Sequence, residues 1–218
     1  MLKFDIVDMK KVAIMVIDME NDFVRPGSSM FVQMANDMLP NVKKLLDACR
    51  KEGATVIYTT HVHGKDRGDM GTMEAIWEPI REQTALVDNT EGIEIYEEIM
   101  PKERDLVIKK HRYSAFYNTD LETQLRNRGV ETLIITGTVT NMCCEATARD
   151  AQHRDYQVIF VSDATGTMDH PGFGTGPMTA GEVQKATLTS LAMCTAEVAS
   201  SEEVLKKIEA TGLKESLP

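Results

Sequence analysis

Three residues of different chemistry each follow an apolar, strand-like run of the chain. Asp18 comes after VAIMVI, Lys110 follows DLVIK, and Cys143 lies a few residues beyond LIITG. Because the carboxyl ends of parallel strands meet at one edge of a sheet, we expect the carboxylate, the ammonium and the thiol to lie close together. Taken singly, each has a plainer explanation, as a turn cap, a solvated charge or a small buried hydrophobe. Together they indicate a thiol nucleophile beside a charged pair.

The position of Cys143 suggests how its thiol would be activated. A free thiol has a pKa of about 8.5, and both a helix start and a neighbouring ammonium favour the thiolate. Cys143 stands where the helical segment CCEATARDAQHRD is expected to begin. A nearby carboxylate can take the thiol proton and later return it to a leaving amine. This arrangement is typical of an amide hydrolase.

The elements that must position these residues alternate along the chain. Apolar runs recur at KVAIMVIDM, ATVIYTTHV, DLVIKK, ETLIITGTV and QVIFVSD, with TAEVAS weaker, and helical patterns separate most of them. Buried strands that alternate with helices predict a three-layer α-β-α sandwich with a mainly parallel, roughly six-stranded, Rossmann-like sheet. Thr119 with Glu122, and Ser200 with Glu203, fit capping boxes that begin two of the helices. We expect one domain over residues 1–218.

Composition narrows the class of partner. The net charge of -10 opposes binding to nucleic acid or anionic lipid, so a small-molecule partner is expected. The first residues have neither a signal-peptide core nor a membrane span, which predicts a cytoplasmic protein without membrane contact. The cysteines form no C-x-x-C pair, so neither structural zinc nor a disulfide framework is suggested.

Two segments do not follow the alternation of strands and helices. Residues 63–83 and 165–181 each come after a predicted strand, at the sheet edge where open α/β folds bind ligands. Long connections in compact domains are either functional loops or exposed linkers, and both interpretations stay open here.

Three blocks carry a resemblance to a known family. VIDMENDF (residues 16–23), KKHRYSAF (109–116) and ITGTVTNMCCEATARDA (135–151) resemble, in matching order, the signature blocks of the isochorismatase-like cysteine hydrolase superfamily. The resemblance spans roughly residues 11 to 200. It implies a catalytic triad of Asp18, Lys110 and Cys143, with Cys144 at a neighbouring, core-facing helix position.

The resemblance also implies a mechanism. The family places a cis peptide just before the residue that matches Thr140, which would aim the N–H groups of Thr140 and Cys143 at the substrate oxygen as an oxyanion hole. Cys143 would attack a carbonyl and form a thioester. Asp18 would protonate the departing nitrogen and then activate water, while Lys110 would stabilise the thiolate and carboxylate.

The branch within the superfamily is suggested by the cysteine and by the histidines. A cysteine at position 143 argues against vinyl-ether cleavage, since that branch carries a small residue there. Nicotinamidases carry metal ligands as Asp-x-His, whereas this chain has His61 and His63 at that spacing. The resemblance is therefore to the ureidoacrylate, biuret and N-carbamoylsarcosine hydrolases, which implies no metal, no cofactor and a homo-oligomer, either a dimer or a tetramer. Residues expected to contact the substrate are Asn21, Phe23, His61, Arg67, Arg112 and Gln184.

Two other functions stay open from the sequence. One is a metal-dependent nicotinamidase that uses His61 and His63. The other is a non-catalytic or redox-sensing protein on the same fold, in which Cys143 and Cys144 respond to oxidants.

Overall fold

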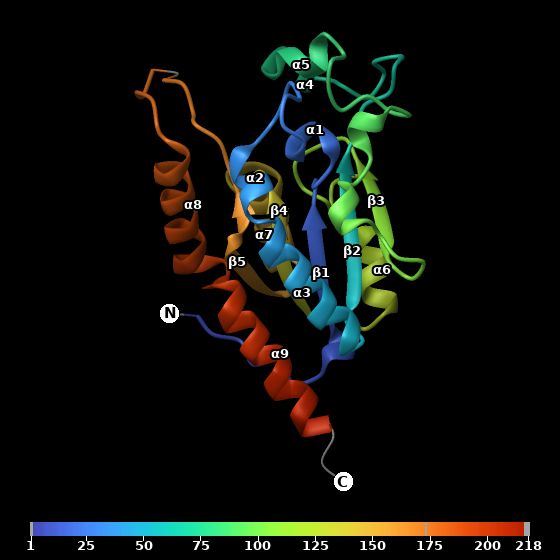
Figure 1. Cartoon of the computed structure of the whole chain (residues 1–218), viewed down its shortest axis with the longest axis vertical. Coiled ribbons are helices and arrows are strands. Elements are labelled where there is room, and N and C mark those ends of the chain that lie inside the picture. The colour runs from blue at the N-terminus through green and yellow to red at the C-terminus, as the bar shows by residue number, and fades with distance from the viewer. Residues whose placement is uncertain (1, 173, 216–218) are drawn as a thin grey trace.

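The computed structural model describes residues 2–172 and 174–215, and these form a six-stranded sheet in which every pair of neighbouring strands is parallel (Figure 1). The strand order is β3-β2-β1-β4-β5-β6, so the connections reverse direction between β1 and β4. Open parallel sheets bind ligands at such a reversal, beyond the carboxyl ends of the strands. The strands are β1 (Val12–Ile17), β2 (Thr55–His61), β3 (Leu106–Lys110), β4 (Thr132–Thr138), β5 (Gln157–Gly166) and β6 (Glu197–Ala199).

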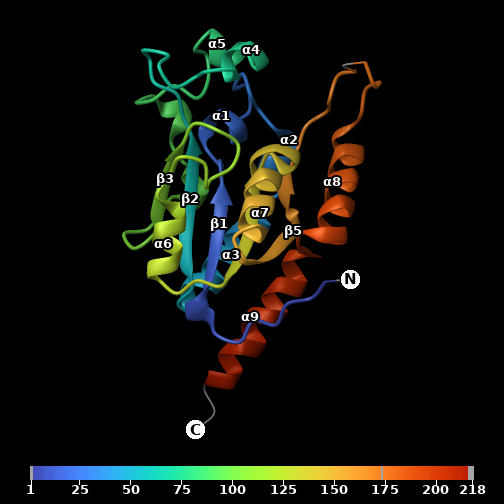
Figure 2. The ribbon, with the colours of Figure 1, turned by 180° about the vertical axis from the view of Figure 1, so that it is seen from behind.

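Helices cover both faces of this sheet, which confirms the predicted sandwich. On the face turned to the viewer in Figure 1 lie α3 (Leu39–Lys51) and α9 (Ser201–Glu215). Figure 2 shows the opposite face, which is covered by α6 (Leu121–Asn127) and α7 (Glu145–Gln152), with α8 (Ala180–Cys194) at its side. Each layer of helices encloses its own apolar core against the sheet.

The central strand β1 shows why the fold needs both layers. All six of its side chains are buried. Because successive side chains point to opposite faces, Ala13, Met15 and Ile17 enter one core, while Ile14 and Val16 enter the other. A strand that is apolar on both faces is stable only when both faces are covered.

Short elements gather at the carboxyl ends of the strands. There α1 (Asn21–Val24) follows β1, and α4 (Met73–Ile76) and α5 (Glu78–Arg81) lie above the sheet at the top of Figure 1. The remaining short elements are α2 (Gln33–Asp37), the 3-10 turns η1 (Met9–Lys11), η2 (Glu91–Ile93) and η3 (Glu97–Ile99), and the π-helical turn η4 (Thr140–Cys144). Within the described residues, no helix is long and apolar enough to cross a membrane.

Two predicted helix starts need correction, and one is confirmed. Cys143 does not begin α7 but lies in η4, which precedes it. Thr119 and Glu122 form no capping box, because α6 begins after Asp120 and Thr119 instead accepts a hydrogen bond from the Leu121 N–H.

The capping box of Ser200 and Glu203 is present as predicted. Glu203 accepts a hydrogen bond from the Ser200 N–H at 2.8 Å, and the Ser200 hydroxyl accepts one from the Glu203 N–H at 3.3 Å. These two bonds satisfy backbone donors that a helix start leaves without a partner.

Candidate active site

Asp18, Lys110 and Cys143 meet at the carboxyl end of the sheet. The Lys110 Nζ lies 2.7 Å from Asp18 Oδ2 and donates a hydrogen bond to Cys143 Sγ at 3.3 Å. Asp18 and Lys110 have no exposed surface, and Cys143 is 3% exposed. The ammonium therefore lies between the carboxylate and the thiol, away from bulk water, where electrostatic interactions are strong.

The neighbouring strand β2 fixes the orientation of the Asp18 carboxylate. Asp18 directly follows β1 with a positive φ of 48°, and its N–H donates to the Thr59 carbonyl at 3.1 Å. The Thr59 hydroxyl donates to Asp18 Oδ1 at 2.6 Å. One carboxylate oxygen is thus held by Thr59, which leaves Oδ2 for Lys110 and the thiol.

Gly137 allows the cysteine-bearing end of β4 to approach β1. Gly137 has a φ of 112°, and a Cβ at this position would overlap the backbone of Ile17. Only glycine fits a backbone contact of this kind with a positive φ. The close contact sets η4 beside the end of β1 and therefore sets Cys143 beside Asp18.

The two adjacent cysteines have different surroundings. Cys143 lines a small pocket, whereas Cys144 is fully buried in the apolar core beneath α7. The resemblance to the family implies that Cys143, and not Cys144, contacts the substrate, and this assignment stays a prediction.

The predicted oxyanion hole, formed by the N–H groups of Thr140 and Cys143, lies in η4 and stays a prediction. The Met142 and Cys144 N–H groups both donate to the Val139 carbonyl, so these two donors are occupied. The Thr140 hydroxyl is buried without a hydrogen-bond partner in the described part of the chain. A cis peptide bond joins Thr138 to Val139, one residue earlier than expected.

Burial of Cys143 acts against the thiolate that the sequence led us to expect. Burial, and then the negative charge of Asp18, raise the pKa of the Cys143 thiol above its ordinary value and outweigh the effect of Lys110. Burial opposes the charge on Lys110, but Asp18 and Cys143 outweigh it and raise the Lys110 pKa. The surroundings of Cys143 therefore favour the protonated thiol, and Lys110 lies 2.7 Å from the Asp18 carboxylate.

The pocket beside Cys143 is small and mainly apolar. Its volume is about 10 Å³. Residues from both irregular segments line it, including Met73 of α4, Trp77 between α4 and α5, and Met168 after β5. Residue 173 of the second segment lies outside the described residues. Both segments therefore contribute to the site instead of serving only as connections.

Comparison with known proteins identifies the family. The family model named Isochorismatase domain matches residues 12–203. The chain belongs to the isochorismatase family. A solved structure described as a cysteine hydrolase from Pseudomonas syringae pv. phaseolicola is 38% identical, with a TM-score of 0.92 over 96% of this chain and 97% of that one.

Curated relatives fall into more than one functional group of the family. The ureidoacrylate amidohydrolase RutB of Agrobacterium fabrum is 32% identical over 70% of this chain and 75% of its own length. Nicotinamidase 3 of Arabidopsis thaliana is 34% identical over 84% of this chain and 81% of its own length. The resemblance seen in the sequence is confirmed at the level of the family, while the substrate is left open.

Among the residues expected to contact substrate, Phe23 and His61 line the pocket with Cys143. His61 is 2% exposed, and its Nε2 has no hydrogen-bond partner among residues 2–172 and 174–215. Ligand atoms of His61, Asp18 and Cys143 lie within 4.8 Å of one another. His61 can therefore reach a group that reacts at the thiol.

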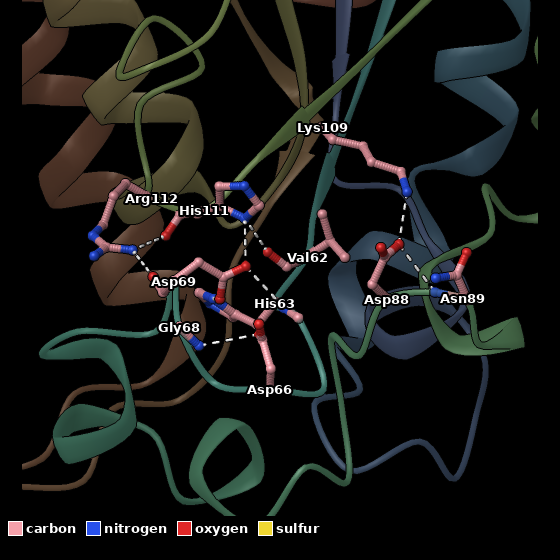
Figure 3. A network of polar contacts seen from close by, with 11 residues as sticks. Val62, His63, Asp66, Gly68, Asp69, Asp88, Asn89, Lys109, His111 and Arg112 are labelled. Carbon is pink, nitrogen blue, oxygen red and sulfur yellow. Dashed lines mark hydrogen bonds and ion pairs between the residues drawn. The ribbon is translucent and has the colours of Figure 1, made fainter.

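The two arginines lie outside this pocket lining. The Arg67 guanidinium donates to the Arg81 carbonyl at 2.5 Å. Arg112 donates to the carbonyls of Asp69 and His111, at 2.8 and 2.6 Å, and Figure 3 shows its guanidinium held between them. Both cations therefore bind backbone oxygens of the surrounding loops.

Asn21 and Gln184 likewise have structural partners. The Asn21 side chain donates to the Glu91 carbonyl at 2.8 Å and lines a different, outer groove. The Gln184 side chain of α8 donates to the carbonyls of Ser162 and Thr165, both at 3.0 Å. Contact of these two residues with substrate stays a prediction.

A second cluster of possible metal ligands lies near the site. Ligand atoms of His63, Asp69 and His111 lie within 4.8 Å of one another, and Figure 3 shows the His111 imidazole turned toward the Asp69 carboxylate. The His63 Nδ1 is 3.0 Å from Asp69 Oδ1, and the His111 Nδ1 is 3.4 Å from Asp69 Oδ2. Two imidazoles and a carboxylate are a donor set that suits zinc. However, His111 Nδ1 also lies 2.6 Å from the Val62 carbonyl, which competes for the same atom.

Sequence reasoning did not find several residues of the site. Thr59 was missed, although it precedes His61 by two residues and so points to the same face of β2. Met73 and Trp77 lay in a segment already expected to be functional, but no local pattern marks which of its side chains face inward. The sequence also did not show that Glu20, two residues after Asp18, is a buried carboxyl group.

Proposed function

We propose that this isochorismatase-family protein is a cysteine amidohydrolase. It would cleave a C–N bond of a small amide or ureido substrate through a thioester and release ammonia or an amine. The observation that carries this proposal is the placement of Lys110 Nζ at 2.7 Å from Asp18 Oδ2 and 3.3 Å from Cys143 Sγ. The similarity to an amidohydrolase, RutB, supports the same class of reaction.

In the first half of the reaction, Asp18 takes the proton of the Cys143 thiol as the sulfur attacks the substrate carbonyl carbon. The carbonyl π electrons move to the oxygen, which receives hydrogen bonds from the Thr140 and Cys143 N–H groups. The tetrahedral intermediate then collapses, the C–N bond breaks, and Asp18 gives its proton to the departing nitrogen. Cys143 is left as a thioester.

In the second half, Asp18 removes a proton from water as the water oxygen attacks the thioester carbon. Collapse of this intermediate breaks the C–S bond and releases the carboxylic or carbamic acid. The Cys143 thiolate recovers its proton from Asp18. Lys110 keeps its positive charge throughout and stabilises the negative charge on either partner.

Two observations bear on the two alternative functions, an oxidant-sensing protein and a metal-dependent nicotinamidase. The raised pKa of both Cys143 and Cys144, caused first by their burial, makes a thiolate-based oxidant sensor a poor fit. The cluster of His63, Asp69 and His111, together with the similarity to nicotinamidase 3, favours a metal-dependent nicotinamidase as the second candidate. A metal held there would polarise or orient a substrate atom.

The proposed function is tested by replacing Cys143, and replacement of the adjacent Cys144 is the control. Ammonia release is measured on biuret, N-carbamoylsarcosine, ureidoacrylate and nicotinamide. Cys143→Ala should lose at least about 10⁴-fold in kcat, as expected when a nucleophile is removed. Cys144→Ala should keep most of the activity and lose only stability. Equal loss in both variants would contradict the assignment of Cys143.

A chelator separates the two candidates. Turnover of a ureido compound that survives chelation supports the metal-free amidohydrolase. Turnover limited to nicotinamide, lost on chelation and restored by zinc, would instead support the nicotinamidase and a metal at His63, Asp69 and His111.

A further inference from the structure

The pocket beside Cys143 carries no side chain that would pair with a charged substrate. It is lined by Phe23, Met73, Trp77, Ile80 and other apolar residues, together with His61 and Tyr113. Within the described part of the chain, no Lys, Arg, Asp or Glu side chain lines it. A pocket of this composition binds the non-reacting part of a substrate by apolar contact.

The positively charged side chains near the site, Lys110 and Arg112, already bind other groups of the protein. Lys110 is fully buried and bound to Asp18, Cys143 and the Arg112 carbonyl, the last at 3.0 Å. The Arg112 guanidinium is held by the carbonyls of Asp69 and His111. A carboxylate that entered the pocket would therefore lose its hydration and gain no cation, which is strongly unfavourable.

The polar atoms of the lining offer few hydrogen bonds to a ligand. The Trp77 Nε1 donates to the Tyr113 hydroxyl at 2.9 Å, so these two groups satisfy each other and present their rings. His61 Nε2 is the buried polar atom left without a partner among the lining residues that the structure describes. One uncharged hydrogen-bonding group, near the reacting amide, is what this lining can accommodate.

We infer that the substrate is an uncharged carboxamide or urea whose non-reacting part is apolar, either a branched alkyl or a phenyl group. This inference rests on the proposed amidohydrolase function and narrows its substrate. It disfavours a carboxylated ureido compound, because such a compound would place its second carboxylate among methionine and aromatic side chains.

Entry of such a group requires the cover of the pocket to move. A volume of about 10 Å³ is roughly that needed for one water molecule. The side chains of Met73 and Ile80, from the two four-residue helices α4 and α5, are almost fully buried above it. The α4–α5 segment is therefore the cover that opens and then packs on the substrate.

Matched substrate pairs test the inference on the intact protein. 4-Methylpentanamide and succinamate have the same amide and spacer, but one ends in an isopropyl group and the other in a carboxylate. Benzamide and 3-carbamoylbenzoate form a second pair. The neutral member should have a kcat/KM at least about 100-fold higher, given the cost of burying an unpaired charge. Equal or faster turnover of the carboxylates would overturn the inference and leave the proposed function standing.

Binding can be measured separately from turnover because Trp77 is the only tryptophan of the chain. In the Cys143→Ala variant, 4-methylpentanamide or benzamide should change the Trp77 fluorescence saturably, while the carboxylates should not at the same concentrations. If neutral amides bind but the wild type hydrolyses none of them, the proposed function fails and the pocket assignment holds. If neither member of a pair binds or reacts, the pocket assignment fails.

A pair of arginine substitutions adds a gain-of-function test. Ile80 lines the pocket and is 1% exposed, whereas Ile76 lies on the neighbouring helix α4 and is 58% exposed. Ile80→Arg should shift the preference toward succinamate by at least about 10-fold, because it supplies the missing cation. Ile76→Arg should leave the preference unchanged. A shift of equal size in both variants would contradict the assigned lining.

Discussion

At the scale of a single residue, we expect the buried carboxyl group of Glu20 to lower the stability of the folded protein at neutral pH. Its side chain has no exposed surface, and neither carboxyl oxygen has a hydrogen-bond partner in the described ranges. Burial, and then the negative charge of Asp18, raise its pKa well above that of a free glutamate. We therefore expect the folded protein to keep a proton on Glu20 that the unfolded chain releases above a pH of about 4.5.

Glu20→Gln tests this protonation. Because the folded state binds the proton more tightly, the wild type loses stability as pH rises from the unfolded pKa toward the folded one, by up to about 1.4 kcal/mol per pH unit. Glutamine resembles the protonated acid and has no proton to lose. The variant should match the wild type near pH 4.5 and have a progressively higher free energy of unfolding at pH 6 and 7, measured with urea.

The exposed Glu182 is a control, because its pKa is shifted in the opposite direction and its effect on stability therefore has the opposite dependence on pH. Hydrogen bonds from the backbone and side chain of Thr179 lower the Glu182 pKa, so its contribution to stability is present above the unfolded pKa and is lost as pH falls. Glu182→Gln should therefore be less stable than the wild type at pH 7. A Glu20→Gln difference that does not change with pH would show that Glu20 is ionised in the folded protein.

Sequence reasoning predicted the meeting of Asp18, Lys110 and Cys143, because each residue stands just past or at the end of a recognisable strand. It did not predict the protonation states, which depend on burial. It also did not predict that Arg67 and Arg112 bind loop carbonyls, because such contacts depend on the conformation of long loops.

At the scale of elements, the contact between β1 and β4 is set by Gly137. Gly137→Ala should lower the free energy of unfolding by about 3 kcal/mol or more, since the added methyl group meets backbone that cannot move aside. Separation of the two strands would also move Cys143 from Asp18, so activity should fall with stability. Activity is assayed on the soluble fraction, and unfolding is followed by circular dichroism.

Gly181→Ala is the matched control. Gly181 lies in the first turn of α8, and a Cβ there meets no atom within 4 Å. Alanine favours the helix over glycine, so this variant should be unchanged or more stable by about 0.5 kcal/mol. Equal destabilisation by both substitutions would contradict the specific role given to Gly137.

The helix starts show that a local spacing of side chains does not by itself predict a capping box. Thr119 and Glu122 have the same spacing as Ser200 and Glu203, yet only the second pair forms a capping box. The Thr119 hydroxyl donates to the Ala115 carbonyl instead, within a loop held by tertiary contacts. A spacing of side chains predicts a cap only when no competing partner lies nearby.

At the scale of the whole molecule, the architecture was predicted because strands buried on both faces leave few alternatives to a covered parallel sheet. All six strands were located from their apolar runs, including the weak TAEVAS segment that contains β6. A homo-oligomer stays a prediction. Such a prediction depends on the fit between two surfaces, which periodic patterns do not describe.

The fold is closed by contacts between the first residues and the last helix. The buried Glu197 of β6 accepts a hydrogen bond from the Phe4 N–H at 2.6 Å and pairs with Lys207 of α9 at 3.0 Å. Lys207 also donates to the Phe4 carbonyl at 2.6 Å, and the Thr211 hydroxyl donates to the Ile6 carbonyl at 2.7 Å. These polar contacts attach the N-terminal segment to β6 and α9, beside the apolar cluster that Phe4 and Ile6 share with Val204 and Ile208.

Glu197→Gln should therefore weaken the whole fold. It leaves the half-buried Lys207 ammonium without its counter-charge and should lower the free energy of unfolding by about 2 kcal/mol. The matched control is Glu202→Gln, which removes the exposed partner of Lys206 on the same helix and should cause no measurable change. Because Glu197 begins the edge strand β6, whereas Asp18 and Cys143 lie beyond the carboxyl ends of β1 and β4, kcat should be retained in both variants at temperatures where they are folded. A loss confined to fraying of the N-terminal segment, with an unchanged main unfolding transition, would show that this closure is local and does not support the sheet.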